Sequence, residues 1–212
     1  MPFDRYRYIV VEGPIGVGKT SLARRLAMQT GAATLLEKPE ENPFLARFYE
    51  DPARHALPVQ LFFLFQRINE VRELAQMDMF STRTVADYLF DKDALFARLN
   101  LNNDEFTLYQ NIYRGLAPQA PSPDMVIYLQ APVQTLIERV RRRAHAWERP
   151  ISDEYLARLA QAYSDFFYHY TAAPVLAVNS EHLNFVDNDE DFALLVQRIE
   201  GMRGRREFFS KG

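Results

Sequence analysis

Residues 13–20 read Gly-Pro-Ile-Gly-Val-Gly-Lys-Thr, and this stretch decides the fold. It matches G-x-x-x-x-G-K-[ST], the pattern of a loop whose backbone N–H groups close around phosphate oxygens. The pattern requires a strand before the loop and a helix after it. The β-branched run at 9–11 is typical of a buried strand, and the apolar residues of 20–29 recur at helical spacing. The stretch therefore predicts a nucleotide phosphate site in an α/β fold.

The loop positions differ in what they offer a phosphate. The glycines let the backbone approach it closely, and the N-terminus of the following helix adds its positive end. Lys19 would bring a cation to the β- and γ-phosphates, and the Thr20 hydroxyl can ligate Mg²⁺. The residues expected to bind the nucleotide are Gly13, Pro14, Ile15, Gly16, Val17, Gly18, Lys19, Thr20 and Ser21.

The rest of the chain alternates short apolar segments with helix-like ones. Strands are expected at 6–12, 33–36, 84–86, 125–130 and 175–178. Helices are expected at 20–29, 44–49, 57–79, 93–99, 104–116, 133–143, 152–170 and 190–202, with Pro58 in the first turn of the third. This order predicts a three-layer P-loop fold, in which helices flank a five-stranded parallel sheet. We expect residues 1–212 to form a single domain whose charged tail, from Arg203 on, is frayed.

Composition excludes several classes of protein. The 212 residues are 48% hydrophobic, which is incompatible with a disordered chain, and the formal net charge of −3 argues against a nucleic-acid coat protein. The absence of cysteine excludes disulfides, thiolate metal sites and cysteine nucleophiles. The sequence contains no apolar run of membrane-spanning length, and its first residues lack the apolar stretch typical of a signal peptide, so we expect neither a membrane span nor such a peptide. We expect a cytoplasmic protein without nucleic-acid or membrane partners.

A phosphate loop does not by itself specify a reaction. A GTPase would carry Asn-Lys-x-Asp after a later strand, and this sequence has none. A motor or ATPase usually shows an apolar strand that ends in an acid, and the comparable element here is Val85-Ala86-Asp87. The size of the chain favours a kinase of a small molecule.

Several segments in a fixed order resemble the deoxynucleoside kinase family, and are most similar to its bacterial deoxyadenosine/deoxyguanosine kinases. The similarity extends from about residue 7 to 200. It is carried by Glu37 after the second strand, Gln60, Asp87 after the third strand, Arg139, Arg143 and Glu148. The resemblance implies transfer of the γ-phosphoryl group of ATP to the 5′-hydroxyl of a deoxynucleoside, with Mg²⁺, in a homodimer.

The resemblance also implies a role for each of these residues. Glu37 is expected to be the base, and Asp87 to assist with metal or water; both follow strands, at the edge where α/β proteins bind ligands. Gln60 would pair with the nucleobase, while Tyr49 and Glu148 would hold the 3′-hydroxyl. Arg139 and Arg143 are four residues apart, so both can reach one polyphosphate. They would belong to a lid at about 139–151.

Substrate preference depends on two further positions. Arg67 lies two helical turns after Gln60, so it can face the same pocket, and Asp93 matches a family position near the base. An Arg–Asp pair offers donors and an acceptor to a purine, which favours deoxyadenosine or deoxyguanosine. Pyrimidine deoxynucleosides stay open as substrates.

The sequence departs from the family pattern at two positions. Tyr88 follows Asp87 where the family usually has arginine, so a cation is missing there; Arg67, Lys92 or a lid arginine could replace it. His145 stands where a third lid arginine would be, and we leave it out of the site. Two other functions stay open: a nucleoside monophosphate kinase resembling thymidylate kinase, and a non-enzymatic P-loop switch.

Overall fold

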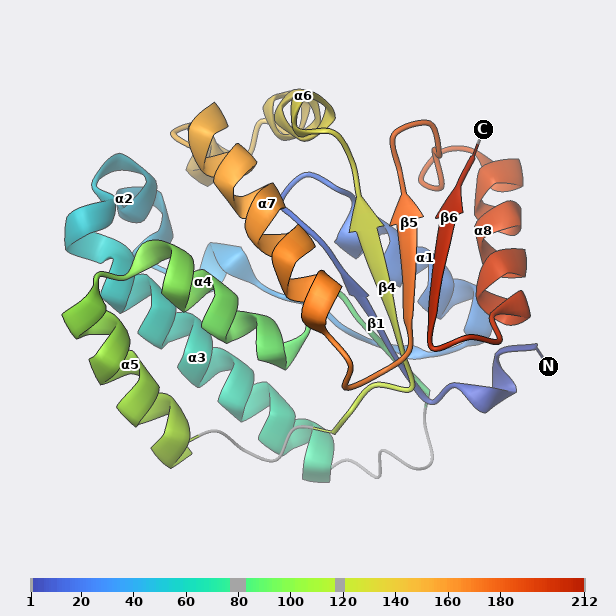
Figure 1. The fold of residues 1–212 in the computed structure, drawn as a ribbon, viewed down its shortest axis with the longest axis horizontal. Coiled ribbons are helices and arrows are strands. Elements are labelled where there is room, and N and C mark those ends of the chain that lie inside the picture. The colour runs from blue at the N-terminus through green and yellow to red at the C-terminus, as the bar shows by residue number, and fades with distance from the viewer. Residues whose placement is uncertain (1, 77–82, 117–120, 212) are drawn as a thin grey trace.

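The structure is a computed structural model that describes residues 2–76, 83–116 and 121–211. The third expected helix was predicted to end at residue 79, which lies outside the described residues. Within these ranges, the core is a parallel sheet in the order β2-β3-β1-β4-β5-β6 (Figure 1). The strands are β1 (Tyr8–Glu12), β2 (Ala33–Leu35), β3 (Thr84–Ala86), β4 (Met125–Gln130), β5 (Val175–Asn179) and β6 (Arg206–Ser210). The expected α/β class with a parallel sheet is therefore confirmed.

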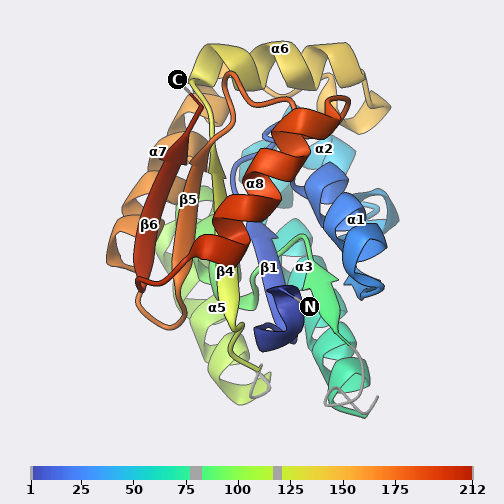
Figure 2. The ribbon, with the colours of Figure 1, turned by 90° about the vertical axis from the view of Figure 1, so that its right-hand side faces the viewer.

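Helices cover both faces of this sheet (Figures 1 and 2). The α-helices are α1 (Lys19–Thr30), α2 (Leu45–Glu50), α3 (Pro52–Gln76), α4 (Asp93–Asn100), α5 (Asn103–Leu116), α6 (Val133–Arg143), α7 (Asp153–His169) and α8 (Asp189–Gly201). Short 3₁₀ turns are η1 (Pro2–Arg5), η2 (Pro39–Glu41), η3 (Phe90–Lys92) and η4 (Ala146–Glu148). No helix in the described part of the chain is long and apolar enough to cross a membrane.

Alternating side chains of the central strands form two cores. In β1, Ile9 and Val11 pack with α1 and α8 on one face, while Val10 packs with α7 on the other. Each of the three is fully buried, as expected for a parallel sheet covered on both sides. A third core joins α2, α3, α4 and α5. Packing against helices on both faces thus fixes the positions of the strand ends relative to one another.

The helix α3 begins earlier than expected. Pro52 is its first residue, a position that suits proline because the missing N–H would have no partner there. Pro58 therefore lies inside the helix, beyond the first turn where we expected it.

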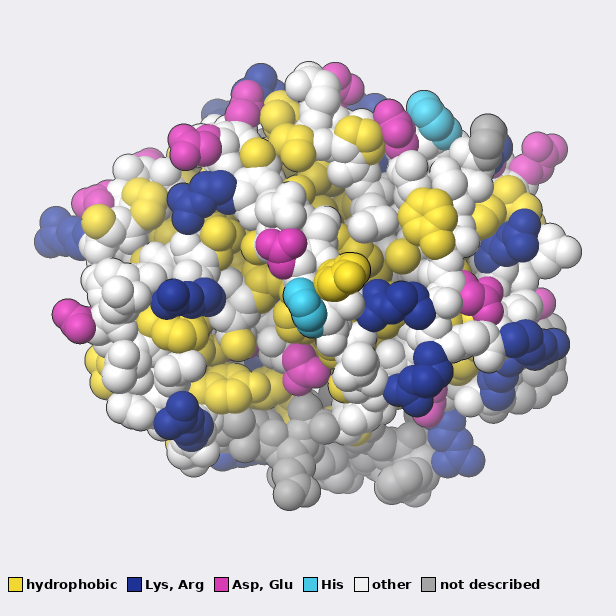
Figure 3. Space-filling model, in the orientation of Figure 1, with side chains coloured by type: hydrophobic (Ala, Val, Ile, Leu, Met, Phe, Trp, Pro, Cys, Tyr) yellow, Lys and Arg dark blue, Asp and Glu magenta, His cyan; other side chains and the backbone are white. Residues whose placement is uncertain are grey.

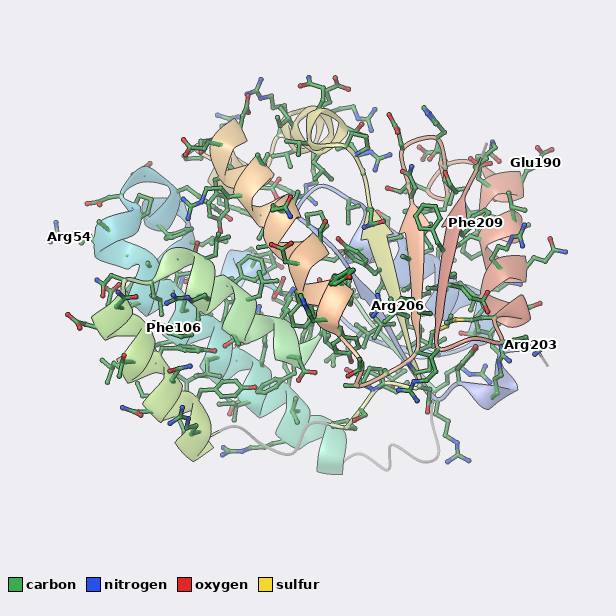
Figure 4. The ribbon with its side chains drawn as sticks, viewed as in Figure 1. Arg54, Phe106, Glu190, Arg203, Arg206 and Phe209 are labelled. Atoms are coloured by element: carbon green, nitrogen blue, oxygen red, sulfur yellow. The ribbon has the colours of Figure 1, made fainter. Side chains whose placement is uncertain are left out.

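The sheet has one strand more than the five expected, because the tail is not frayed. Residues 206–210 pair in parallel with β5, and Val175 lies opposite Arg206. The Arg206 guanidinium donates to the carbonyl oxygens of Phe167 and Tyr170, at 2.7 and 2.6 Å. Phe209 packs into the core shared with α8 (Figure 4). A single buried residue in a charged stretch does not produce a recognisable strand pattern.

Two neighbouring phenylalanines test the role of β6. Phe209 is 7% exposed and Phe208 is 65% exposed. We expect Phe209→Ala to lower the free energy of unfolding by about 3 kcal/mol, because it leaves a cavity in the core. Phe208→Ala should change it by less than about 0.5 kcal/mol. Denaturant unfolding measures both, and equal effects would contradict this packing.

Charged side chains of both signs are interspersed on the face drawn in Figure 3. This mixture agrees with the formal net charge of −3.

Candidate active site

A cavity of about 570 Å³ opens beside the glycine-rich loop. Its lining includes the start of α1, Glu37 just after β2, and Asp87 just after β3. Parallel strands end at the same edge of a sheet, so residues far apart in the sequence meet here. The volume is in the range of small-molecule sites.

The loop at 13–18 lies against other parts of the fold so closely that it requires glycine. Gly13 and Gly16 have φ angles of 150° and 85°. A Cβ on Gly13 would lie 2.4 Å from the Leu129 carbonyl oxygen, and one on Gly16 would lie 2.9 Å from that of Leu136. The loop is therefore fixed between β4 and α6, and it presents α1 with its first residue, Lys19, at the cavity wall.

The Lys19 ammonium lies back against this loop, 2.8 Å from the carbonyl oxygen of Gly13. Burial lowers the pKa of Lys19, as does Lys92, while Glu12, Glu37 and Asp87 oppose the shift. A phosphate placed here would stabilise the charged form of Lys19.

Thr20 and Asp87 both line the cavity and contact each other. The Thr20 hydroxyl donates to Asp87 Oδ2 at 2.5 Å, and the backbone N–H of Glu37 donates to Asp87 Oδ1 at 2.7 Å. Burial raises the pKa of Asp87 against these two hydrogen bonds. A cation would stabilise this carboxylate, and oxygen donors suit Mg²⁺, which needs few protein ligands when it also binds phosphate and water. Thr20 and Asp87 therefore fit a Mg²⁺ site, although the described residues contain no cluster of three or more acidic, histidine or cysteine ligands.

Glu37 lies between two cations. Arg67 donates to its Oε1, and the Lys92 ammonium is 3.4 and 3.5 Å from its two carboxylate oxygens. Burial by itself would raise the pKa of Glu37, but Lys92 and Arg67 outweigh it and lower the pKa to about 2. Glu37 is therefore ionised at neutral pH and only weakly basic. It suits a hydrogen-bond acceptor that orients a hydroxyl more than a strong proton abstractor.

The wall of the cavity also carries an amide. Gln60 lines it and is only 2% exposed, and its Nε2 has no hydrogen-bond partner among the described residues. A buried amide donor without a partner is costly, so this group is suited to a ligand acceptor.

Asp93 lies behind this wall rather than on it. It is fully buried, and its two oxygens accept from Arg67 and from the Tyr109 hydroxyl. Asp93 is absent from the cavity lining, whereas Arg67 belongs to it. The expected Arg–Asp pair is thus present, with the aspartate in the role of holding the arginine.

The segment expected to be a lid starts within α6 and includes η4. Arg143 donates two hydrogen bonds to Glu148, and both residues line the cavity together with Tyr49. Burial, Tyr155 and Glu148 together raise the pKa of the Tyr49 hydroxyl, which keeps it a donor. Arg139 instead donates to the hydroxyl and carbonyl oxygens of Ser180, and it does not line the cavity. The structure thus brings Arg143, but not Arg139, to the site.

Comparison with known proteins gives one family. The family described as deoxynucleoside kinase matches residues 9–202. The chain belongs to the deoxynucleoside kinase family. Among its relatives, a deoxyguanosine kinase of Bacillus subtilis is 30% identical, over 91% of this chain and 96% of that protein. A deoxyadenosine kinase of Lactobacillus acidophilus is 29% identical, over 85% and 88%.

Solved structures agree with the fold of this kinase. A deoxyadenosine kinase from M. mycoides with bound dATP covers 92% of the chain at 21% identity, with a TM-score of 0.79. The same enzyme with the products dCMP and a flexible dCDP gives a TM-score of 0.80 at 22% identity. Each of these two structures is covered completely.

Sequence reasoning missed part of the wall of this kinase. His145 was left out of the site, yet it lines the cavity, and Trp147 stacks on its ring. Phe63, a residue of the third core, lines the cavity as well. Phe96 also lines the cavity, whereas Phe106, on α5, is not part of the lining (Figure 4). No spacing rule marks such residues, because they come from elements that meet only in the fold. The cavity lining also includes Arg24, Asn100, Tyr155 and Tyr163.

Proposed function

We propose that the kinase transfers the γ-phosphoryl group of ATP to the 5′-hydroxyl of a deoxynucleoside. One observation carries the proposal: a single cavity is lined by the phosphate loop, by Glu37 and by the unpaired amide of Gln60. A nucleoside has matching ends, with a hydroxyl at one and a base edge at the other. Its base would pair with Gln60 while its 5′-hydroxyl reaches Glu37.

The chain's own residues would act mainly by positioning and by neutralising charge, as in phosphoryl transfer generally. Glu37 would accept a hydrogen bond from the 5′-hydroxyl and aim its oxygen at the phosphorus. Lys19 would hold the β- and γ-phosphates, and Arg143 would face them from the lid segment. Mg²⁺, held by Thr20 and Asp87, would neutralise charge on the phosphates when bound.

The sugar and the base would be held by separate groups. Tyr49 and Glu148 face the cavity beside Arg143, which places them for a 3′-hydroxyl. Gln60 and Arg67 would face the base, and the relatives named for deoxyguanosine and deoxyadenosine favour a purine. The composition without cysteine and the family resemblance are the grounds for proposing a cytoplasmic homodimer. Arg139 stays a predicted lid residue that would leave Ser180 to reach phosphate.

The family match does not favour the two alternative functions. A nucleoside monophosphate kinase would need a basic residue after the third strand for the acceptor's phosphate, and Tyr88 stands at that place. A nucleotide switch has no need of an acceptor cavity closed by a buried amide.

A phosphorylation panel tests the proposal. The purified kinase would be given ATP, Mg²⁺ and each of the four deoxynucleosides, the ribonucleosides, or their monophosphates. We expect deoxynucleoside monophosphates as products, with purines used best. Phosphorylation of monophosphates alone, or ATP hydrolysis without an acceptor product, would reject the proposal.

Gln60 gives the sharpest test of the base end. Gln60→Leu keeps the side-chain size but removes both hydrogen-bonding groups, so we expect kcat/KM for the nucleoside to fall by about 100-fold, with the KM for ATP unchanged. Gln66→Leu on the same helix is the control, since Gln66 binds Glu41 at the surface. Equal kcat/KM values in the two variants would show that the base does not meet Gln60.

A further inference from the structure

The segment after β3 supplies no cation at the position where the resemblance led us to expect one. Tyr88 is 1% exposed and does not line the cavity. Its hydroxyl donates to Glu70 of α3 at 2.5 Å. The cation near Glu37 must therefore come from elsewhere in the chain.

Lys92, at the end of η3, lies at that place. It is 1% exposed, yet it lines the cavity. Its ammonium is 3.5 Å from Glu12 Oε2 as well as 3.4 Å from Glu37 Oε1. Two carboxylates that converge on one point repel each other unless a cation lies between them. Lys92 is placed to allow this convergence.

Glu12 contacts both Lys92 and the phosphate loop. It is the last residue of β1, and its carboxylate accepts from the backbone N–H groups of Gly13 and Leu89 at 2.9 and 2.7 Å. The Tyr163 hydroxyl of α7 donates to it at 3.0 Å. Both oxygens of Glu12 are thus held rigidly, so the ammonium that contacts Glu12 has a fixed position relative to the loop.

The other cations considered for this role have different partners. Arg143 binds Glu148 and Arg139 binds Ser180. Arg67 does bind Glu37, but its second nitrogen binds Asp93, which is not part of the cavity lining. Of these cations, Lys92 is the one that connects Glu37 to Glu12, whose carboxylate accepts from Gly13 of the phosphate loop.

Tyr88 supports this arrangement through its ring. The ring centroid is 6.0 Å from the Lys92 ammonium and 5.8 Å from the Arg67 guanidinium carbon. The face of an aromatic ring attracts cations at such distances. Tyr88 therefore lies against both cations that hold Glu37.

We propose that Lys92, anchored by Glu12, is the positioning residue that fixes the Glu37 carboxylate relative to the phosphate loop, in place of a cation at position 88. The proposal rests on the proposed function, in which Glu37 orients the acceptor hydroxyl. Lys92 would hold Glu37 in the position that the transition state requires. Loss of Lys92 should therefore lower kcat more than it raises the KM for ATP or the KM for the nucleoside.

The absence of cysteine from the chain allows a chemical test at this one position. The Lys92→Cys variant would be alkylated in denaturant and refolded, with one portion treated with 2-bromoethylamine and the other with iodoacetamide. The first reagent restores a side chain of lysine length with an amine, and the second leaves a neutral amide. The parent kinase carried through the same steps, and Lys38→Met, which removes an exposed lysine next to Glu37, are the controls.

We expect the neutral adduct to lose about 100-fold in kcat, with each KM within about threefold of the parent, and the amine adduct to recover most of the loss. Retention of kcat in the neutral adduct would overturn the proposal. So would a loss in both adducts while their melting temperatures match that of the parent. A parent without nucleoside phosphorylation would instead reject the proposed function, which separates the two failures.

A double variant covers the case in which the alkylated Lys92→Cys variant does not refold. Lys92→Met with Glu12→Gln removes the cation together with the carboxylate that would face Glu37, so the melting temperature should approach the parent value. The proposal expects kcat to stay about 100-fold low in this protein. Recovery of both melting temperature and kcat would mean that Lys92 only balances Glu12.

Discussion

Glu37→Gln is expected to lower kcat by about 100-fold or more while ATP still binds with its normal affinity. The amide has the same size as the carboxylate, but one of its two groups is a donor that Lys92 and Arg67 repel. The side chain would then turn, and the acceptor hydroxyl would lose the oxygen that orients it. Among the described residues, the hydrogen-bond and ion-pair partners of this side chain are Arg67 and Lys92 and not the phosphate loop, so nucleotide binding should be kept.

Steady-state kinetics together with calorimetric ATP binding would measure this change. Glu41→Gln is the matched control, because Glu41 is exposed and pairs with Lys38 at the surface. A kcat in Glu37→Gln within about threefold of the parent would mean that the acceptor hydroxyl does not meet Glu37.

Asp93→Ala should cause the largest loss of stability among single changes in the site. It removes the acceptor of both Arg67 and Tyr109 in a fully buried position. Breaking a buried ion pair from one side costs about 3–5 kcal/mol. Arg67 keeps Glu37 as a partner, so we expect about 3 kcal/mol, which corresponds to a fall in melting temperature of about 6–12 °C for a chain of this size.

Thermal unfolding measures this loss directly. Asp165→Ala is the control, since the Asp165 side chain is exposed on α7 and accepts a hydrogen bond from Gln161 of the same helix. We expect the control to change stability by less than about 0.5 kcal/mol. Similar melting temperatures for the two variants would contradict the buried network around Arg67.

The residues that the sequence identified are those whose chemistry is local or lies at strand ends. The phosphate loop at 13–20 could be recognised from the sequence alone, because the strand and the helix that the motif requires directly precede and follow it. Glu37 and Asp87 each follow a strand, and parallel strands end at one edge, so their meeting follows from the fold class. The Arg67–Asp93 pair was expected from the helical spacing of Arg67 after Gln60 and from the family position of Asp93, though the burial of Asp93 was not.

What the sequence could not predict depends on contacts between distant elements. Glu12 and Lys92 are 80 residues apart, and only the pairing of β1 with β3 brings them together. Residues 206–210 become a strand because β5 offers an edge, not because their pattern is strand-like. Arg139 shares a helix face with Arg143, yet Ser180 after β5 binds it elsewhere.

The central claim is that phosphate is transferred to an oxygen on C5′, at the Glu37 end of the cavity. The most direct measurement is phosphorus NMR of the product made from ATP and the best deoxynucleoside, alongside the same nucleoside without its 5′-hydroxyl. We predict a single monophosphate whose phosphorus couples to the two C5′ protons, and no nucleotide product from the 5′-deoxy analogue. Phosphorus coupled to the C3′ proton, or phosphorylation of the analogue, would contradict the account.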